Sequence, residues 1–388
     1  MRLLHTSDWH LGRTLYGKKR YPEFVAFLDW LIRTLETEKI DALLVSGDVF
    51  DTGTPANRAQ QLYYRFLCRA AASGCRHVII TAGNHDSPSF LNAPRELLSA
   101  LDVHVSAAAA PPEQQVLVLE DEKKQPRAIV CAVPYLRDRD IRTVSAGESA
   151  DAKQEKMSAG IAGHYERVCA LAGQIQQDHL QDGGPRLPVI AMGHLFTAGG
   201  RTLKDDGVRE LTVGTLDHVG TDIFPECIDY LALGHLHIPQ TVAGREHMRY
   251  CGSPIPMGFG EAGQPKTVIR VDFKTREPEI QTIAVPCFQP LVRIRGPVEE
   301  ICRRIEALRQ ENSRAWLEIE YTGKTPAGDL RQKAEEAVQG SDMEIRRIKN
   351  RQLSHTILTA ARADLSLDDL TETQVFTRCL KRHEIPEA

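Results

Sequence analysis

No hydrophobic run in the 388-residue sequence approaches the ~20 apolar residues that a membrane-spanning helix requires. The first residues turn polar after Leu3 and Leu4, so the apolar core of a signal peptide is missing as well. The nine cysteines are scattered, odd in number and without a C-x-x-C pair, which favours reduced thiols. We therefore expect a cytoplasmic protein with no membrane partner.

Excess basic charge is also missing, since 48 Lys and Arg face 52 Asp and Glu, for a formal net charge of −4. Proteins that bind DNA often carry a basic balance, so any DNA contact here must use local positive charge or metal ions. No Gly-x-x-x-x-Gly-Lys-Ser/Thr phosphate loop is present, so any ATP dependence must come from a partner. Composition alone indicates only a globular protein with a sizeable core.

Short apolar runs recur through the first two-thirds of the chain, and each is followed by a polar cluster. The runs are Leu3-Leu4, Ala42 to Val45, Val78 to Ile80, Val189 to Met192 and Tyr230 to Leu233. Such runs, rich in Val, Ile and Leu, predict buried strands. Apolar residues spaced by three and four, from Phe24 to Leu35 and from Leu62 to Leu67, predict helices between them. Strands that alternate with helices predict an α/β domain.

The sequence also indicates a division into domains. We expect residues 1–285 to form the main domain, with an exposed connection at residues 106–127, which are rich in Ala and Pro and then charged. Between residues 286 and 350, strand and helix patterns alternate in the order βαβαβ, which predicts a small capping domain. Residues 351–388 are mostly polar and predict a helical tail.

Residue types that bind metals follow five of the predicted strands. The segments are Asp8-x-His10, Gly47-Asp48, Gly83-Asn84-His85-Asp86, Gly193-His194 and Gly234-His235-x-His237. Sites in open α/β sheets form outside the carboxyl ends of strands, and the flanking glycines allow sharp turns there. One such segment alone is compatible with an ordinary turn, but five in this order predict convergence on one crevice.

The seven candidate ligands comprise two carboxylates, one amide and four imidazoles, which are too many for one ion and suit two. They are Asp8, His10, Asp48, Asn84, His194, His235 and His237. Asp48 is the natural bridge, because a carboxylate has two oxygens. An oxygen and imidazole set without thiolate suits manganese, iron or zinc. Two ions roughly 3.5–4 Å apart form the usual clamp for displacement at phosphorus.

The order of these motifs resembles the calcineurin-like metallophosphoesterase superfamily over residues 1–285, and the flanking residues narrow the resemblance to the SbcD family of bacterial nuclease subunits. The stretches that carry the narrower resemblance are His5 to Gly12, Gly47 to Asp51, Ala82 to Ser87 and Tyr250 to Pro256. The resemblance implies a four-layer α/β/β/α sandwich with a small C-terminal βαβαβ capping domain. It extends into that capping domain, and so covers nearly all of the chain.

The same resemblance implies a distribution of ligands and two catalytic residues. One ion is expected at Asp8, His10, Asp48 and His237, and the other at Asp48, Asn84, His194 and His235. His85 is expected beside the scissile phosphate, where an imidazole can stabilise the transition state or protonate the leaving 3′ oxygen. Asp51 is expected to orient His85, and the alternative for Asp51 is a residue that caps a loop.

A basic cluster follows the first motif and consists of Arg13, Lys18, Lys19 and Arg20, with Tyr16 among them. Near the site these residues can hold DNA phosphates. The alternative is a solvated loop.

The leading hypothesis is a manganese-dependent nuclease, for which the resemblance implies double-strand exonuclease and single-strand or hairpin endonuclease activity in DNA repair, recombination and replication. It also implies an SbcC-like coiled-coil ATPase, docked at residues 351–388, and a homodimer within a heterotetramer. The residues expected to pair the two copies are Leu62, Tyr63, Phe66, Leu67, Leu97 and Leu98. The alternative is that these residues only cover the sheet of their own domain. The competing hypotheses are a phosphodiesterase for small esters such as cyclic nucleotides and a scaffold subunit without catalysis.

Overall fold

The computed structural model describes residues 1–142, 148–201, 219–274, 277–323 and 329–350. The chain divides into two compact units, Met1–Phe288 and Gln289–Ala388. The predicted tail at 351–388 lies outside the described residues. Among the helices that are described, none is long and apolar enough to cross a membrane.

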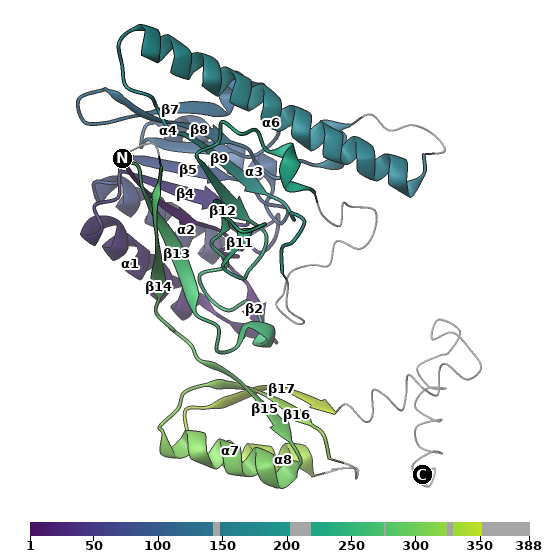
Figure 1. Ribbon diagram of the computed structural model, residues 1–388. Coiled ribbons are helices and arrows are strands. Elements are labelled where there is room, and N and C mark those ends of the chain that lie inside the picture. Colours follow the sequence, from purple (N-terminus) through teal and green to yellow (C-terminus); the bar gives the residue numbers. More distant parts are fainter. Residues whose placement is uncertain (143–147, 202–218, 275–276, 324–328, 351–388) are drawn as a thin grey trace. The chain divides into compact units, whose positions relative to one another are not determined.

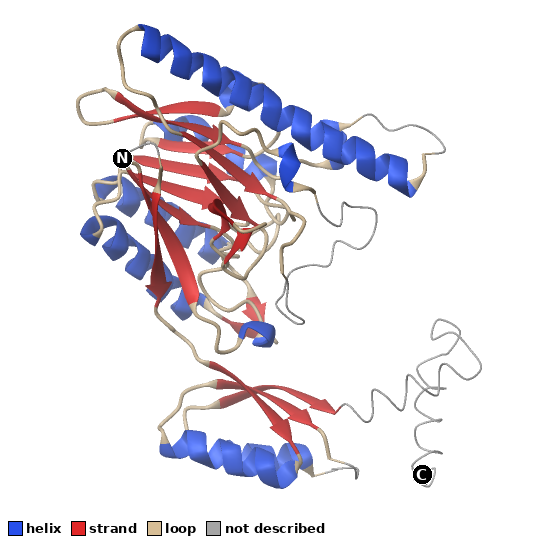
Figure 2. Cartoon of the chain, in the orientation of Figure 1, coloured by secondary structure: helices blue, strands red, loops and turns tan. Residues whose placement is uncertain are grey.

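The larger unit contains two six-stranded sheets, drawn in red in Figure 2. The first has the order β14-β13-β1-β4-β5-β6, in which β1, β4, β5 and β6 are parallel and β13 and β14 join in antiparallel fashion. Three of the predicted apolar runs form its central strands. These runs are continuously apolar because the strands of a parallel sheet are covered on both faces. Its members are β1 (Arg2–Thr6), β4 (Ala42–Ser46), β5 (His77–Thr81), β6 (Val103–Ser106), β13 (Lys266–Asp272) and β14 (Glu279–Val285).

The second sheet has the order β11-β12-β10-β9-β8-β7, with parallel pairs from β8 to β12 and antiparallel strands at both edges. Its members are β7 (Val116–Glu120), β8 (Pro126–Ala132), β9 (Val189–His194), β10 (Tyr230–Gly234), β11 (Gln240–Val242) and β12 (Arg245–Tyr250). The expectation of an exposed connection at residues 106–127 is wrong. Strand β7 lies there and buries Leu119 against the first sheet while Val118 stays exposed, the alternation of an edge strand.

Helices cover the outer faces of the two sheets and complete a four-layer sandwich (Figure 1). Helices α1 (Tyr21–Thr37) and α2 (Asn57–Ala72) pack on the first sheet, and α6 (Ala150–Gln181) packs on the second. A third apolar cluster lies between the sheets, with Leu44 from β4 and Ile190 from β9 among its members. The predicted fold class is confirmed. The remaining short elements are β2 (Thr14–Leu15), β3 (Lys18–Lys19), α3 (Pro88–Asn92), α4 (Arg95–Ser99), η1 (Pro112–Gln114), α5 (Asp138–Ile141), η2 (Thr221–Ile223) and η3 (Phe259–Glu261).

The second unit has the predicted βαβαβ order and one parallel sheet, β15-β16-β17. Its elements are β15 (Leu291–Gly296), α7 (Val298–Gln310), β16 (Trp316–Tyr321), α8 (Leu330–Val338) and β17 (Glu344–Asn350). Both helices pack on one face of the sheet around Ile301, Ile305 and Leu317. On the other face Glu318 is buried beneath Arg293 and Lys349, which neutralise its charge.

Buried polar contacts join the two sheets of the larger unit, and one of them involves His5. His5 of β1 places its ring nitrogen Nδ1 3.0 Å from the hydroxyl of Tyr230 in β10, and the two rings meet edge to face. Neither residue is exposed. Burial lowers the pKa of His5 to about 3, so the folded protein keeps this ring neutral.

We predict that His5 makes the stability of the protein fall in mild acid. The unfolded chain takes up a proton at this ring below about pH 6.5 and the folded chain does not, so the contribution of His5 is complete above that pH and is lost as the pH falls towards 3. Between pH 7 and pH 5 the contribution of His5 to the free energy of unfolding falls by about 2 kcal/mol. Urea unfolding of wild type and His5→Gln at pH 5, 6 and 7 measures it. The variant should show the shallower pH dependence, and equal slopes would contradict the assignment.

Candidate metal centre

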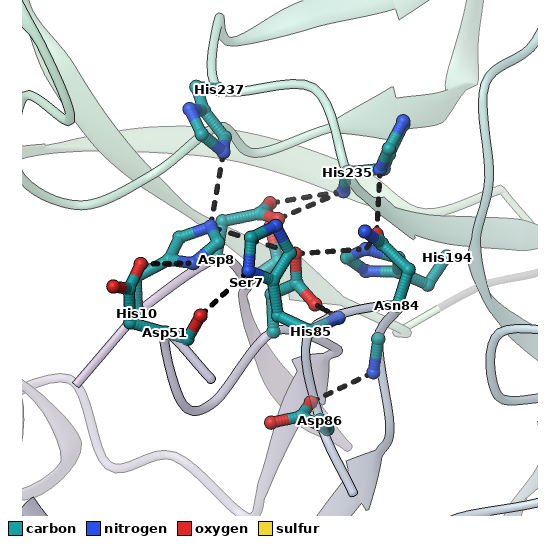
Figure 3. Close-up of polar contacts among 12 residues, drawn as sticks. Ser7, Asp8, His10, Asp51, Asn84, His85, Asp86, His194, His235 and His237 are labelled. Atoms are coloured by element: carbon teal, nitrogen blue, oxygen red, sulfur yellow. Dashed lines mark hydrogen bonds and ion pairs between the residues drawn. The ribbon is translucent and has the colours of Figure 1, made fainter. Parts of the chain in front are cut away.

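The turns that follow three central strands adopt a backbone that few residues tolerate. Asp8 and His10 after β1, Asp48 after β4 and His235 after β10 have φ angles of 53°, 45°, 50° and 102°. Residues other than glycine rarely adopt positive φ, and where they do so in a cluster the strain commonly serves a functional site. Here the turns bring residues from both sheets to one point (Figure 3).

Two of the predicted glycines permit this convergence because a side chain has no room there. A Cβ atom at Gly83 would overlap the Asp48 carboxylate, and one at Gly234 would overlap the main-chain oxygen of Ser46. Glycine therefore allows the loops after β5 and β10 to approach the end of β4.

The first group of donors consists of Asp8, His10 and His237, whose ligand atoms lie within 4.8 Å of one another. The Nε2 atoms of His10 and His237 face each other at 3.2 Å. All three residues are buried. Two imidazole nitrogens at this separation, beside a carboxylate, form an arrangement that suits a shared cation.

The second group contains Asp8, Asp48 and His194, again within 4.8 Å. Asn84 joins it, since its Oδ1 lies 3.0 Å from His194 Nε2 and 3.1 Å from His235 Nδ1. Asp8 belongs to both groups. Asp48 also connects them, because its Oδ2 lies 3.4 Å from His194 Nε2 and 3.6 Å from His10 Nε2. The geometry thus gives Asp48 a central position between two sets of donors.

The electrostatics of this cluster differ from one donor to the next. Burial alone would raise the pKa of the Asp48 carboxyl, but the charge and hydrogen bond of His194 hold it well below its usual range. Burial also lowers the pKa of His10 well below its usual value and that of His235 to about 3. Burial raises the pKa of Asp8, and against the effect of burial the charge and hydrogen bond of Asp48 raise the pKa of His194 to about 9. Ionised carboxylates and neutral imidazoles are the forms that donate electron pairs to a metal, so a cation that binds here must displace the proton of His194. The donor types present, carboxylate, amide oxygen and imidazole, fit divalent ions.

His85 lies beside the first donor group, with its ring edge-on to His10 at a centroid distance of 4.8 Å. Its Nδ1 is 2.8 Å from the main-chain oxygen of Asp51. The expectation that the Asp51 side chain orients His85 needs correction: that carboxylate lies 3.6 Å from His10 Nδ1 and 3.1 Å from Arg13 Nη1. Asp51 therefore holds His85 through its main chain and faces His10 with its side chain.

The predicted basic cluster separates into two environments. Arg13 reaches the edge of the site through Asp51, and the β2–β3 hairpin carries Lys18, Lys19 and Tyr16, whose exposed ring stacks on Phe259 at 5.9 Å. Arg20, expected to bind DNA, is instead buried. Its guanidinium forms two 2.7 Å bonds to Glu23 and one of 2.6 Å to the Pro256 carbonyl, so its charge is used inside the protein.

Sequence reasoning missed the role of Asp86, the last residue of the Gly-Asn-His-Asp segment. Its buried carboxylate accepts hydrogen bonds from the main-chain N–H groups of Gly83 at 2.9 Å, Phe50 at 2.9 Å and Val49 at 3.1 Å. These bonds join the loop after β4, which carries Asp48, to the loop after β5, which carries Asn84 and His85. The presence of Asp86 in a quoted segment was the only signal for this role.

Comparisons with known proteins agree with the geometry. Residues 1–239 match the calcineurin-like phosphoesterase family, and residues 287–384 match the family described as type 5 capsule protein repressor C-terminal domain. The SbcD subunit of the SbcCD nuclease from Escherichia coli (strain K12) is 38% identical over 100% of this chain and 94% of that protein. The SbcD subunits from Rhodobacter capsulatus and Bacillus subtilis are 35% and 32% identical over 79% and 82% of this chain and 76% and 78% of theirs.

A solved dimetal phosphatase from Danio rerio is similar with a TM-score of 0.38 and 11% identity, over 74% of this chain and 99% of that chain, which is too low to carry an argument. The family match over more than half of the chain makes this protein a calcineurin-like phosphoesterase. Within that class it belongs to the SbcD family of SbcCD nuclease subunits. The predicted resemblance is confirmed.

We predict that Asp48→Ala loses bound metal. Removal of the carboxylate between the two donor groups leaves each with fewer ligands, so both ions should bind more weakly. Elemental analysis of protein purified with manganese should show two ions per wild-type chain and fewer than one in the variant. Asp121→Ala, which removes a partly exposed carboxylate in the turn after β7, is the matched control. A folded Asp48→Ala protein that retains two ions would exclude the bridge.

Proposed function

We propose that this chain is the catalytic subunit of a nuclease and hydrolyses phosphodiester bonds in DNA by a two-metal mechanism. The observation that carries the proposal is the position of Asp48, within 3.6 Å of imidazoles in both donor groups. A carboxylate shared in this way suits a pair of ions acting on one phosphate. The relatives named as the SbcD subunit of the SbcCD nuclease support a nucleic acid as the substrate, and DNA is the nucleic acid that we propose.

The proposed ligands of one ion are Asp8, His10, Asp48 and His237, and those of the other are Asp48, Asn84, His194 and His235. When bound, such ions supply an activated water and neutralise charge on the phosphate oxygens. Manganese is the proposed metal; the donor set, with carboxylate and amide oxygens, imidazoles and no thiolate, suits manganese as it suits iron and zinc. The site residues themselves fix the donors before any ion arrives, through the strained turns and the bonds to Asp86.

His85 is the proposed acid that assists departure of the 3′ oxygen. Its Nδ1–H donates to the Asp51 carbonyl, so the other nitrogen, Nε2, is left to meet the substrate. The ring is partly exposed, unlike those of His10 and His237. A histidine that solvent reaches and whose orientation is fixed by one carbonyl is well placed to give a proton to a leaving group.

The proposed DNA contacts are Arg13, Lys18, Lys19 and Tyr16, which lie on the segment directly after Asp8 and His10. Arg13 is bonded to Asp51 at 3.1 Å beside the donor groups, and Lys19 is exposed. Local cations of this kind compensate for a net charge of −4.

The name of the relatives refers to a complex, and we infer that this chain acts within one. The proposed organisation is a nuclease domain at 1–285, a capping domain at 286–350 and a C-terminal segment at 351–388 that docks on an SbcC-like coiled-coil ATPase. Since the sequence has no phosphate loop of its own, the energy of ATP would reach the site through that partner. DNA repair, recombination and replication are the processes in which such an enzyme would serve.

A homodimer is the proposed arrangement of two such subunits. Fewer of the expected residues are available for the contact between the copies than the sequence suggested. Tyr63, Phe66, Leu67 and Leu98 belong to the core of their own unit, and Leu62 is partly buried against that core. Leu97, in contrast, is 73% exposed on α4. An apolar side chain with that exposure suits a contact between copies related by a twofold axis.

We predict that His85→Ala separates catalysis from metal binding. The proton donor is lost while every proposed ligand remains, so the rate on hairpin-ended DNA should fall by roughly 10²–10⁴-fold and the manganese content should stay at the wild-type level. His247→Ala, at a partly buried histidine on β12, is the control. Loss of an ion in His85→Ala would show that His85 is a ligand.

Assays on plasmid, hairpin-ended DNA and a small phosphodiester, with and without the ATPase, test which substrate the protein cleaves. Activity on the small ester alone would overturn the nuclease proposal.

We predict that Leu97→Asp gives a folded monomer. A charge at a dimer contact opposes association, whereas the exposed position in the isolated subunit tolerates it. Sedimentation and a melting curve of the purified variant measure both effects, with Leu180→Asp, at an exposed leucine of α6, as control. A folded Leu97→Asp protein that remains fully dimeric would exclude this residue from the interface.

A further inference from the structure

Glu261 lies at the end of η3, outside every motif that the sequence indicated, and its side chain is completely buried. Its Oε1 is 3.3 Å from Nδ1 of His237. Its Oε2 accepts hydrogen bonds from the Ser253 hydroxyl and the Met257 N–H, each at 3.2 Å. With partners on both oxygens, this carboxylate is held in one orientation.

Lys266 of β13 is the second buried charge beside His237. Its Nζ forms an ion pair with Glu261 and donates to Ser253 Oγ at 3.0 Å and to the main-chain oxygen of His237 at 3.1 Å. One ammonium group therefore fixes both the backbone of His237 and the carboxylate that faces its ring. The pair compensates its own charge, as a buried ion pair must.

The second ring nitrogen of His237, Nε2, points to the other proposed metal ligands. It is 3.2 Å from Nε2 of His10, so the two nitrogens of His237 have different tasks. His194 provides a comparison, since its Nδ1 meets the neutral carbonyl of Ser46 at 2.9 Å. A carboxylate in that role fixes the tautomer of a metal-binding imidazole and strengthens it as an electron donor more than a carbonyl does.

We propose that Glu261, held by Lys266, is a positioning residue for His237. It keeps the ring proton on Nδ1 and directs Nε2 towards Asp8 and His10. This inference rests on the proposed function, in which His237 is a ligand. It also gives a purpose to the stretch Tyr250 to Pro256, which the proposed chemistry leaves unused: the Ser253 N–H donates to the His237 carbonyl at 3.2 Å, and its hydroxyl donates to Glu261.

Calorimetric titration of the full chain with manganese tests the proposal. Glu261→Asp keeps the charge opposite Lys266 but withdraws it from the ring, and Glu261→Gln with Lys266→Met removes both charges together, so neither leaves a buried ion unpaired. We expect both proteins to fold and to bind one of the two ions 10- to 100-fold more weakly, the usual effect of such a partner. Glu279→Gln with Lys274→Met, an exposed pair on β14 and its preceding turn, should leave both affinities unchanged.

A second background separates positioning from general support of the fold. In His237→Ala, Glu261→Asp should leave the residual manganese affinity unchanged, because the ring through which Glu261 acts is gone. Wild-type affinity in the two folded Glu261 variants, or an equal loss in the His237→Ala background, would overturn the proposal. Metal affinity is read without DNA, so a chain that shows the predicted binding pattern but cuts no DNA, with or without the ATPase, would refute the nuclease function and leave this inference standing.

Discussion

The carboxylate of Asp48 must reach imidazoles supplied by both sheets, and much of the architecture meets that requirement. His10 follows β1 of the first sheet and His194 ends β9 of the second, yet both rings lie within 3.6 Å of the same oxygen. The face-to-face packing of the sheets brings these strand ends together. Glycines at 83 and 234 then remove the side chains that would keep the loops apart.

Burial of so many polar groups is costly unless they have partners, and the surrounding residues supply many of these partners. Asp86 satisfies three main-chain N–H groups of the loops that carry Asp48 and His85. Asp51 supports His85 with its carbonyl and faces His10 with its carboxylate. Glu261 and Lys266 do the same for His237. The proposed metal ligands are consequently held in place by hydrogen bonds and ion pairs to neighbouring residues, most of which lie in loops.

The sequence predicted the strands and the donor segments well, because both are local patterns: a run such as Val189 to Met192 is apolar whatever surrounds it, and His194 follows it directly. It failed where the outcome depends on tertiary contacts. Arg20 looks like a surface cation until Glu23 and the Pro256 carbonyl enclose it. Glu261 carries no local signal, since only the folding of η3 brings it to His237. Strand β7 was missed although its residues 116–119 are all apolar, because the Ala- and Pro-rich residues before it and the charged residues after it dominate that stretch.

Anomalous X-ray scattering from crystals grown with manganese would show directly whether two metal ions share Asp48. We expect two peaks about 3.5–4 Å apart, one beside His10 and His237 and the other beside Asn84, His194 and His235, with an oxygen of Asp48 bound to both. A single fully occupied peak, or two peaks of which only one contacts Asp48, would contradict the shared bridge.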